Sequence, residues 1–93
     1  MSIVVRFAPA DTTTRQYDDV LRRLNESGEF PPDGLETQVA FGQSGEDFRV
    51  SEIWDSREQF EAYGQRLTPI LVEAGIDVSG ETEIFEVHNI WKR

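Results

Sequence analysis

Residues 35–60, LETQVAFGQSGEDFRVSEIWDSREQF, predict two β-strands joined by a hairpin loop and followed at once by a helix. Side-chain character alternates through Leu35–Phe41 and again through Phe48–Trp54, with the two-residue period of a strand. The intervening stretch 42–47 holds two glycines and two acidic residues, as expected of a loop. Ser56 follows, with Gln59 three positions later, and this capping-box pattern predicts the start of a helix.

The segment before this hairpin predicts one strand and one helix. Residues 2–8, SIVVRFA, are rich in β-branched and aromatic side chains and stop at Pro9. Thr13 and Gln16 form a second capping-box pattern, and Gly28 is expected to end the helix in a left-handed conformation. The apolar residues between them have helical spacing: they are Tyr17, Val20, Leu21 and Leu24.

The segment after the hairpin predicts a second helix and a last strand. The helix runs from Ser56 towards Gly75, where a glycine again suits the end. Pro69 has no N–H to donate to the preceding turn, so the helix is expected to kink or restart near Thr68. Residues 82–91, TEIFEVHNIW, alternate once more and predict the last strand.

The resulting order, β-α-β-β-α-β, is that of a ferredoxin-like α+β domain spanning residues 1–93. Right-handed crossovers place both helices on one face of a four-stranded antiparallel sheet, with the first strand between the third and the fourth. A single domain of this size buries only a small core, so a second copy covering apolar surface is a reasonable expectation.

Composition restricts the partners and the compartment. The 93 residues include 18 acidic side chains against nine Lys and Arg, a formal net charge of −9. This charge repels phosphate backbones and anionic headgroups, so we expect no nucleic-acid and no membrane partner. The chain has no cysteine, which excludes disulfides and thiolate chemistry and is compatible with a reducing cytoplasm, where we expect the protein. The N-terminal segment is too poor in apolar residues for a signal core or membrane span.

The number of histidines and the placement of the glycines also argue against a bound metal or cofactor. A facial-triad metal site needs two histidines and the chain has one, while its glycines are too scattered for a phosphate-binding loop. We therefore expect no metal and no cofactor.

Alternation assigns the strand residues to two sides of the sheet. The side predicted to face the helices is apolar: Ile3, Val5, Phe7, Leu35, Val39, Phe41, Phe48, Val50, Phe85, Val87 and Trp91. The other side is mixed, with Val4, Ala40, Ile53, Ile84 and Ile90 among Arg6, Gln38, Arg49, Ser51, Glu86 and His88. Five exposed apolar side chains favour a symmetric homodimer closed over this side. The alternative is an ordinary sheet face that stays in contact with water.

Polar residues on the strands are the candidates for chemistry. Arg6, Gln38 and His88 are the predicted catalytic residues, as donors to a developing anion. His88 could instead be a general base, because it is the one side chain that ordinarily titrates near neutral pH. Its structural alternative is a hydrogen-bonded strand residue at the dimer seam.

Glu52 is the unusual residue of the third predicted strand. On the apolar side, its carboxylate must find a donor or take up a proton, unless a bulge turns it outwards. With Ser51, Trp54 and Asn89, it completes the predicted substrate-binding set.

Several short motifs resemble those of the dimeric α/β-barrel superfamily. They are PPDGL (31–35), V-x-E-I-W-D-S-x-x-x-F (50–60), L-x-P (67–69), EAG (73–75) and VHN (87–89). The chain is most similar to small uncharacterised bacterial members grouped with antibiotic-biosynthesis-monooxygenase-like proteins. The resemblance implies two sheets paired into a barrel. It also implies a superfamily of cofactor-independent oxygenases, haem-degrading enzymes and isomerases. Relatives often carry histidine where this chain has Gln38.

Two functional hypotheses follow. The first is a homodimer that holds a small organic molecule in an apolar pocket, as a monooxygenase-like enzyme acting without a cofactor on an aromatic or polyketide-like substrate. The second is a non-catalytic dimerisation or ligand-binding module.

Overall fold

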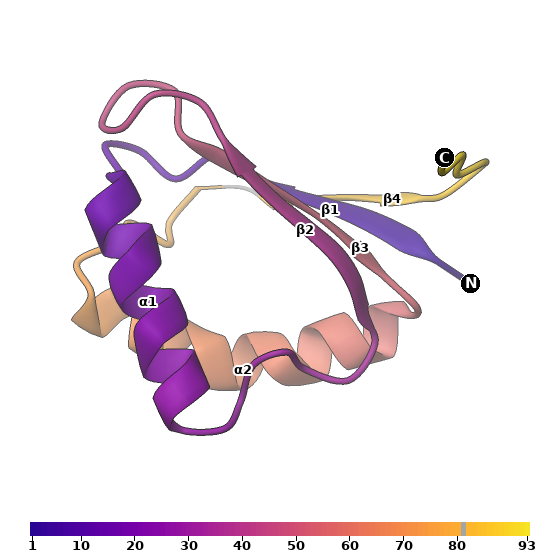
Figure 1. Ribbon diagram of the computed structural model, residues 1–93, viewed down its shortest axis with the longest axis horizontal. Helices are drawn as coiled ribbons and strands as arrows, with labels where there is room; N and C mark the ends of the chain where they lie inside the picture. The colour runs from indigo at the N-terminus through magenta and orange to yellow at the C-terminus, as the bar shows by residue number, and fades with distance from the viewer. Residues whose placement is uncertain (81) are drawn as a thin grey trace.

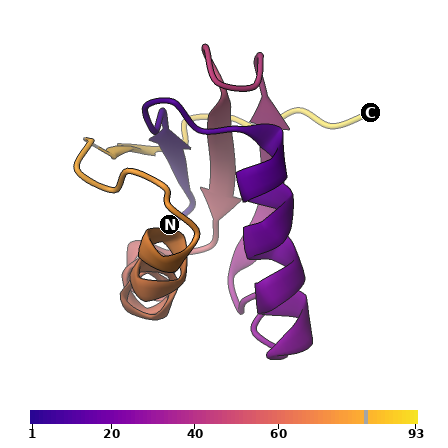
Figure 2. The same cartoon turned by 90° about the vertical axis from the view of Figure 1, so that its left-hand side faces the viewer.

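The computed structural model describes residues 1–80 and 82–93 and has the predicted ferredoxin-like α+β fold. The elements are β1 (Ile3–Phe7), α1 (Thr14–Glu26), β2 (Leu35–Phe41), β3 (Arg49–Trp54), α2 (Arg57–Glu73) and β4 (Glu83–Glu86) (Figure 1). The strands form one antiparallel sheet in the order β2-β3-β1-β4, with β1 between β3 and β4 as expected. Both helices cover the same side of this sheet (Figure 2).

The start of α1 is fixed by the predicted capping box. Thr13 Oγ1 accepts a hydrogen bond from the Gln16 backbone N–H at 3.1 Å, and Gln16 Oε1 accepts one from the Thr13 N–H at 2.9 Å. The Gln16 amide also donates to the carbonyls of Ala74 and Gly75, at 3.3 and 3.2 Å. One side chain therefore caps α1 and ties its first turn to the end of α2.

Replacing Thr13 by alanine is expected to lower the free energy of unfolding by about 1 kcal/mol, because the cap acceptor is lost. For a domain of this size, that change lowers the melting temperature by about 4–8 °C. Thr14→Ala is the matched control, since only the backbone N–H of Thr14 is engaged, with Ser44 Oγ at 3.0 Å. Equal melting temperatures for the two variants would show that the cap contributes nothing.

Helix α2 runs without interruption through Pro69, so the predicted restart near Thr68 is wrong, while the alternative of a kink stays a prediction. Proline removes one hydrogen bond, the one to the carbonyl of Gln65, and both residues are exposed, so water can reach that carbonyl. The Thr68 hydroxyl adds a hydrogen bond to the Gly64 carbonyl at 2.9 Å within the same turn.

A bulge in β2 reverses the predicted sides of that strand. Leu35 pairs with Trp54 but Thr37 already pairs with Ile53, so one residue of β2 is extra. From there on, Gln38 shares the side of Glu52, and Val39 and Phe41 turn away from the helices with exposed fractions of 50% and 41%. The predictions that Val39 and Phe41 face the helices, and that Gln38 and Ala40 do not, are therefore wrong.

The last strand, β4, is shorter than predicted, and its side chains lie on the opposite sides of the sheet from those predicted. It ends at Glu86 because its partner β1 begins at Ile3; one further hydrogen bond, from the Val87 N–H to the Ser2 carbonyl at 2.9 Å, closes the pairing. Ile84 packs on the core, whereas Phe85 lies opposite Val4 and is 54% exposed. The predicted sides of Ile84 and Phe85 are thus exchanged.

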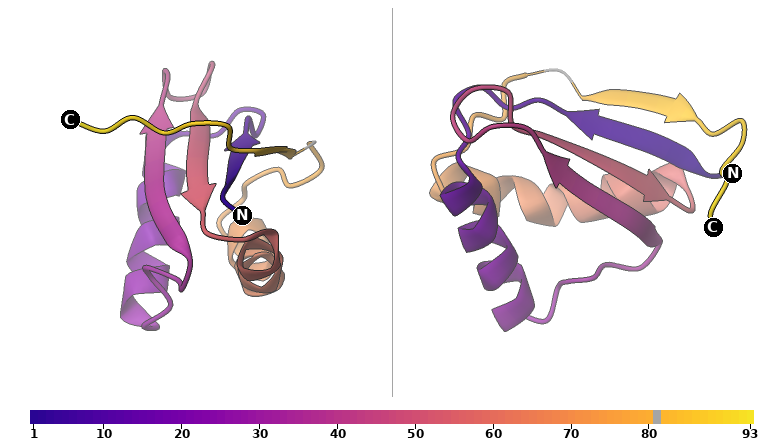
Figure 3. Two further views of the ribbon diagram at one scale, coloured as in Figure 1. Left: turned by 90° about the vertical axis from the view of Figure 1, so that its right-hand side faces the viewer. Right: turned by 45° about the horizontal axis from the view of Figure 1, so that its top comes forward.

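The residues after β4 leave the sheet as a tail. The tail crosses the end of the sheet towards the start of β2 (Figure 3), where Lys92 Nζ lies 3.5 Å from Glu36 Oε1. Trp91 is 80% exposed in this tail, so its predicted place in the core is wrong.

The side of the sheet without helices, which we call the open face (Figure 3), carries five apolar strand residues, as many as predicted, but two of them are phenylalanines. Strand pairing places Val4 and Ile53 there, as predicted, and adds Val39, Phe41 and Phe85. Its polar members are Arg6, Thr37, Arg49, Ser51 and Glu83.

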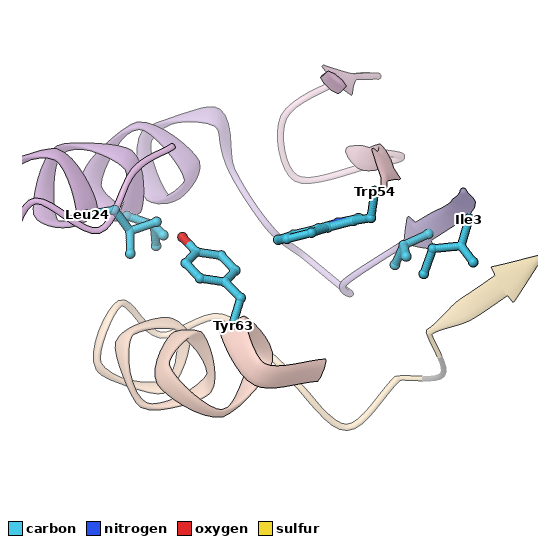
Figure 4. Packing of buried hydrophobic residues seen from close by; sticks show 6 residues of the cluster. Ile3, Leu24, Trp54 and Tyr63 are labelled. Atoms are coloured by element: carbon cyan, nitrogen blue, oxygen red, sulfur yellow. The ribbon is translucent and has the colours of Figure 1, made fainter. Parts of the chain in front are cut away.

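The core lies on the other side, where Trp54 and Val5 are fully buried and Tyr63 packs between Trp54 and α1 (Figure 4). Among the described residues, no helix combines the length and apolar character needed to cross a membrane.

Candidate functional site

A cavity of about 240 Å³ lies between the helix side of the sheet and the two helices. Its wall is mainly apolar and aromatic, and includes Phe7, Tyr17, Phe48, Phe60, Tyr63 and Leu67. Pockets for drug-sized ligands usually measure about 300–1,000 Å³, so this cavity suits a molecule of about one ring.

The carboxyl group of Glu52 lies in this wall, although the residue is only 4% exposed. Trp54, two residues along β3 on the same side, donates its indole N–H to Glu52 Oε1 at 3.0 Å. Gln38 Nε2 donates to Glu52 Oε2 at 2.6 Å, and Gln38 Oε1 accepts a short hydrogen bond from the Tyr17 hydroxyl. A hydrogen-bonded chain thus runs from α1 through β2 to β3.

Burial raises the pKa of Glu52 above its usual range, because a charged carboxylate loses hydration in the core. Hydrogen bonds from Trp54 and Gln38 favour the charged form and oppose part of this effect. Burial and the nearby charge of Glu52 also raise the pKa of Tyr17. The site therefore holds a carboxyl group that takes up a proton more readily than an exposed glutamate.

The side chain of Tyr63 also lies in the cavity wall. Its hydroxyl is buried, with almost no accessible surface, and has no hydrogen-bond partner among the described residues. Figure 4 shows this hydroxyl pointing towards α1 near Leu24. Burial, together with the charge of Glu52, raises the pKa of Tyr63 to about 12. The unpartnered hydroxyl therefore lies behind the cavity wall, in the core.

The charged side chains that the described residues contribute to the cavity wall are negative. Arg66 is outside the wall, and its Cζ lies 5.7 Å from the centroid of the Tyr63 ring. Within the described part of the chain, the wall contains the carboxyl groups of Glu52 and Asp77 and no lysine, arginine or histidine. No cluster of three or more His, Cys, Asp or Glu side chains suited to a metal ion occurs within residues 1–80 and 82–93.

The structure brings together three of the seven predicted site residues. Gln38 and Glu52 line the cavity, and the fully buried Trp54 donates to Glu52 from the core. The bulge that brings Gln38 to Glu52 lies in β2, and the burial of Glu52 shows that the alternative of an outward-turned Glu52 is wrong. The expectation that Gln38 shares a side of the sheet with Arg6 and Ser51 is also wrong.

The other four predicted residues lie elsewhere. Arg6 and Ser51 line a separate hollow on the open face, where Arg6 Nη1 lies 3.9 Å from Glu83 Oε1. His88 and Asn89 are exposed in the tail after β4. Catalytic roles for Arg6 and His88, and substrate binding by Ser51 and Asn89, stay predictions.

Sequence reasoning missed Tyr17 and Tyr63 as site residues. Both occupy apolar stripes of their helices, where an aromatic ring is read as core. The signal that could have identified them is the hydroxyl, because a buried tyrosine needs a partner and Glu52 on the same side is the obvious acceptor.

No protein-family model matches this chain, and no curated protein matches its sequence. Solved structures do match. SnoaB, a cofactor-independent oxygenase from Streptomyces nogalater, is 11% identical with a TM-score of 0.64, over 99% of this chain and 96% of that one. A dimeric ferredoxin-like protein of unknown function from Thermobifida fusca is 18% identical with a TM-score of 0.61, over 94% and 92%.

A third structure, a proposed antibiotic biosynthesis monooxygenase from Chloroflexus aurantiacus, is 16% identical with a TM-score of 0.59, over 98% of this chain and 95% of that one. At such identities, the likeness concerns the fold. The chain shares the ferredoxin-like fold of these three proteins, which confirms the fold predicted from the sequence.

Proposed function

We propose that this protein binds a small, mainly apolar organic molecule in the cavity and that Glu52 exchanges a proton with it. The observation that carries the proposal is the almost fully buried carboxyl group in an aromatic cavity wall. A carboxyl group whose pKa is raised by burial is a better proton acceptor near neutral pH than an exposed one.

The neighbouring residues hold this carboxyl group in place. Tyr17 donates to Gln38 Oε1, which turns the Gln38 N–H groups towards Glu52. Gln38 and Trp54 together use two of the roughly four acceptor positions of the carboxylate. The remaining positions can receive a donor group of the ligand.

The reaction we propose is oxidation of an aromatic substrate by dioxygen without a cofactor. The fold neighbour SnoaB is described as a cofactor-independent oxygenase, which supports this choice. Removing a proton from a phenolic or enolic substrate yields an electron-rich anion, and dioxygen is the oxidant. For a phenol, one oxygen atom becomes a quinone carbonyl and the other leaves as water, so the substrate supplies all four electrons. The size of the cavity favours a substrate of one ring over a fused-ring polyketide.

Glu52→Gln is expected to lower dioxygen uptake with single-ring phenols by about a hundredfold or more, because the proton acceptor is lost. An oxygen electrode measures this after a thermal-shift screen has identified ligands. His88→Ala is the control, since His88 lies outside the cavity. If His88→Ala abolishes uptake and Glu52→Gln does not, the reaction belongs to His88 and the role of Glu52 is refuted.

A second candidate function is ligand binding without catalysis. Both oxygens of Glu52 already accept hydrogen bonds from the protein, as expected of a structural carboxyl group. This function predicts ligands that raise the melting temperature without any dioxygen uptake.

Pairing of two copies through the open face is part of the proposal. Val39, Phe41 and Phe85 are 41–54% exposed on one side of the sheet, and burying them in a second copy recovers about 25 cal/mol per Å². The Thermobifida fusca fold neighbour, described as dimeric, supports this arrangement.

A further inference from the structure

We infer that the ligand of the cavity carries a positively charged amino group that pairs with Glu52. The inference rests on the proposed binding in the cavity, which both candidate functions share, and narrows the ligand to single-ring organic amines. It follows from three features of the cavity: the sign of its charges, its unused hydrogen-bond acceptors and its aromatic wall.

The charges of the wall select against anions. Glu52 and Asp77 are its charged side chains among the described residues, and neither has a lysine, arginine or histidine beside it in the wall. A carboxylate or phosphate entering the cavity would lose its hydration and meet the two negative charges of the wall. A cation would lose hydration too, but would gain attraction to Glu52, and the net charge of −9 draws cations to the protein.

The burial of Glu52 makes a cation preferable to an uncharged ligand. The folded chain has already removed this carboxyl group from water, so that cost does not arise again when a ligand binds. An uncharged ligand leaves a buried carboxylate without a counter-charge. An ammonium group supplies that charge.

The free hydrogen-bond acceptor positions of Glu52 match the N–H donors of an ammonium group. Two acceptor positions of Glu52 remain after the bonds from Gln38 and Trp54. An alkyl ammonium group has three N–H donors, so it can fill both of these positions.

The aromatic rings of the wall suit the rest of such a ligand. Tyr17 and Phe48 meet edge to face with centroids 5.5 Å apart, and Phe60 and Tyr63 each pack against Trp54 at 5.6 and 5.7 Å. Rings of this kind attract a cation to their faces and pack on an aromatic or alkyl body.

The experiment compares three probes of similar size that differ in charge: 2-phenylethylamine, 2-phenylethanol and 3-phenylpropionate. Isothermal titration calorimetry at pH 7 measures their affinities for the full chain. The amine is then protonated, since alkyl amines titrate near lysine, at about 10.4. We expect the amine to bind about tenfold tighter than the alcohol, or more, and the carboxylate not to bind.

Glu52→Gln should weaken amine binding about tenfold or more and leave the alcohol within about threefold. Glu46→Gln, the same change at an exposed loop position, should alter neither. Near-ultraviolet circular dichroism confirms that each variant is folded; if Glu52→Gln is not, the three probes on the unaltered protein still test the inference.

Each remaining outcome contradicts a specific statement. Equal affinity of amine and alcohol for the unaltered protein, or tighter binding of the carboxylate, overturns the amine assignment but keeps the cavity as a binding site. Undiminished amine binding by a folded Glu52→Gln variant overturns the pairing with Glu52. Absence of binding by all three probes, and by larger and smaller analogues, overturns the binding function and the inference with it.

Discussion

Val39→Glu is expected to convert the proposed dimer to a monomer of 10.7 kDa at micromolar concentration. Val39 lies on the open face and is 50% exposed in the single chain. An unpaired carboxylate enclosed between two sheets costs about 3 kcal/mol, or about a hundredfold in dissociation constant. A symmetric interface contains the substitution twice, so the penalty is counted twice. Sedimentation equilibrium measures the mass.

Val72→Glu is the matched control for this experiment. Val72 is 57% exposed, but it lies on α2 and not on the open face. The same change there should leave the dimer intact. Phe85→Glu tests the opposite edge of the open face, on β4, and should dissociate the dimer as Val39→Glu does. A monomeric unaltered protein, or equal behaviour of Val39→Glu and Val72→Glu, would rule out pairing through this face.

Glu52→Gln is expected to make the free energy of unfolding less dependent on pH above about 4.5. Because burial raises the pKa of Glu52 in the folded state, that state binds more protons than the unfolded chain between the ordinary pKa, 4.5, and the folded one. The contribution of Glu52 to stability is therefore fully present below 4.5 and is lost as pH rises through the folded pKa. A pKa that is higher by one in the folded state than in the unfolded chain corresponds to about 1.4 kcal/mol.

Urea denaturation at a series of pH values measures this effect. The glutamine keeps an acceptor for the Trp54 indole, and a half-turn of the Gln38 amide restores its bond to residue 52. Asp19 and Asp77, whose pKa values are lowered by hydrogen bonds, titrate below this window, and Tyr17 and Tyr63 titrate above it. The free energy of unfolding of Glu46→Gln, plotted against pH, should run parallel to that of the unaltered protein. A parallel plot for Glu52→Gln would refute the raised pKa of Glu52.

Sequence patterns within short segments were sufficient to predict the helices and strands and their order. The capping residues Thr13 and Ser56 begin the two helices, and the glycines at 28 and 75 follow their ends with φ values of 77° and 80°. These signals act through bonds between residues a few positions apart, so the sequence carries them directly. Glu52 was identified in the same way, as a carboxyl group at an apolar position of a strand.

The surroundings of Glu52 and the composition of the open face depend on pairing between distant strands. A bulge of one residue in β2 moves Gln38 to Glu52 and turns Val39 and Phe41 outwards. The alternation of β2 is the same on either side of the bulge, so periodicity does not reveal it. The β4 register likewise turns Phe85 outwards and is set by where β1 begins. Sequence thus yields the elements, and hydrogen bonding between strands assigns each side chain to the cavity or to the open face.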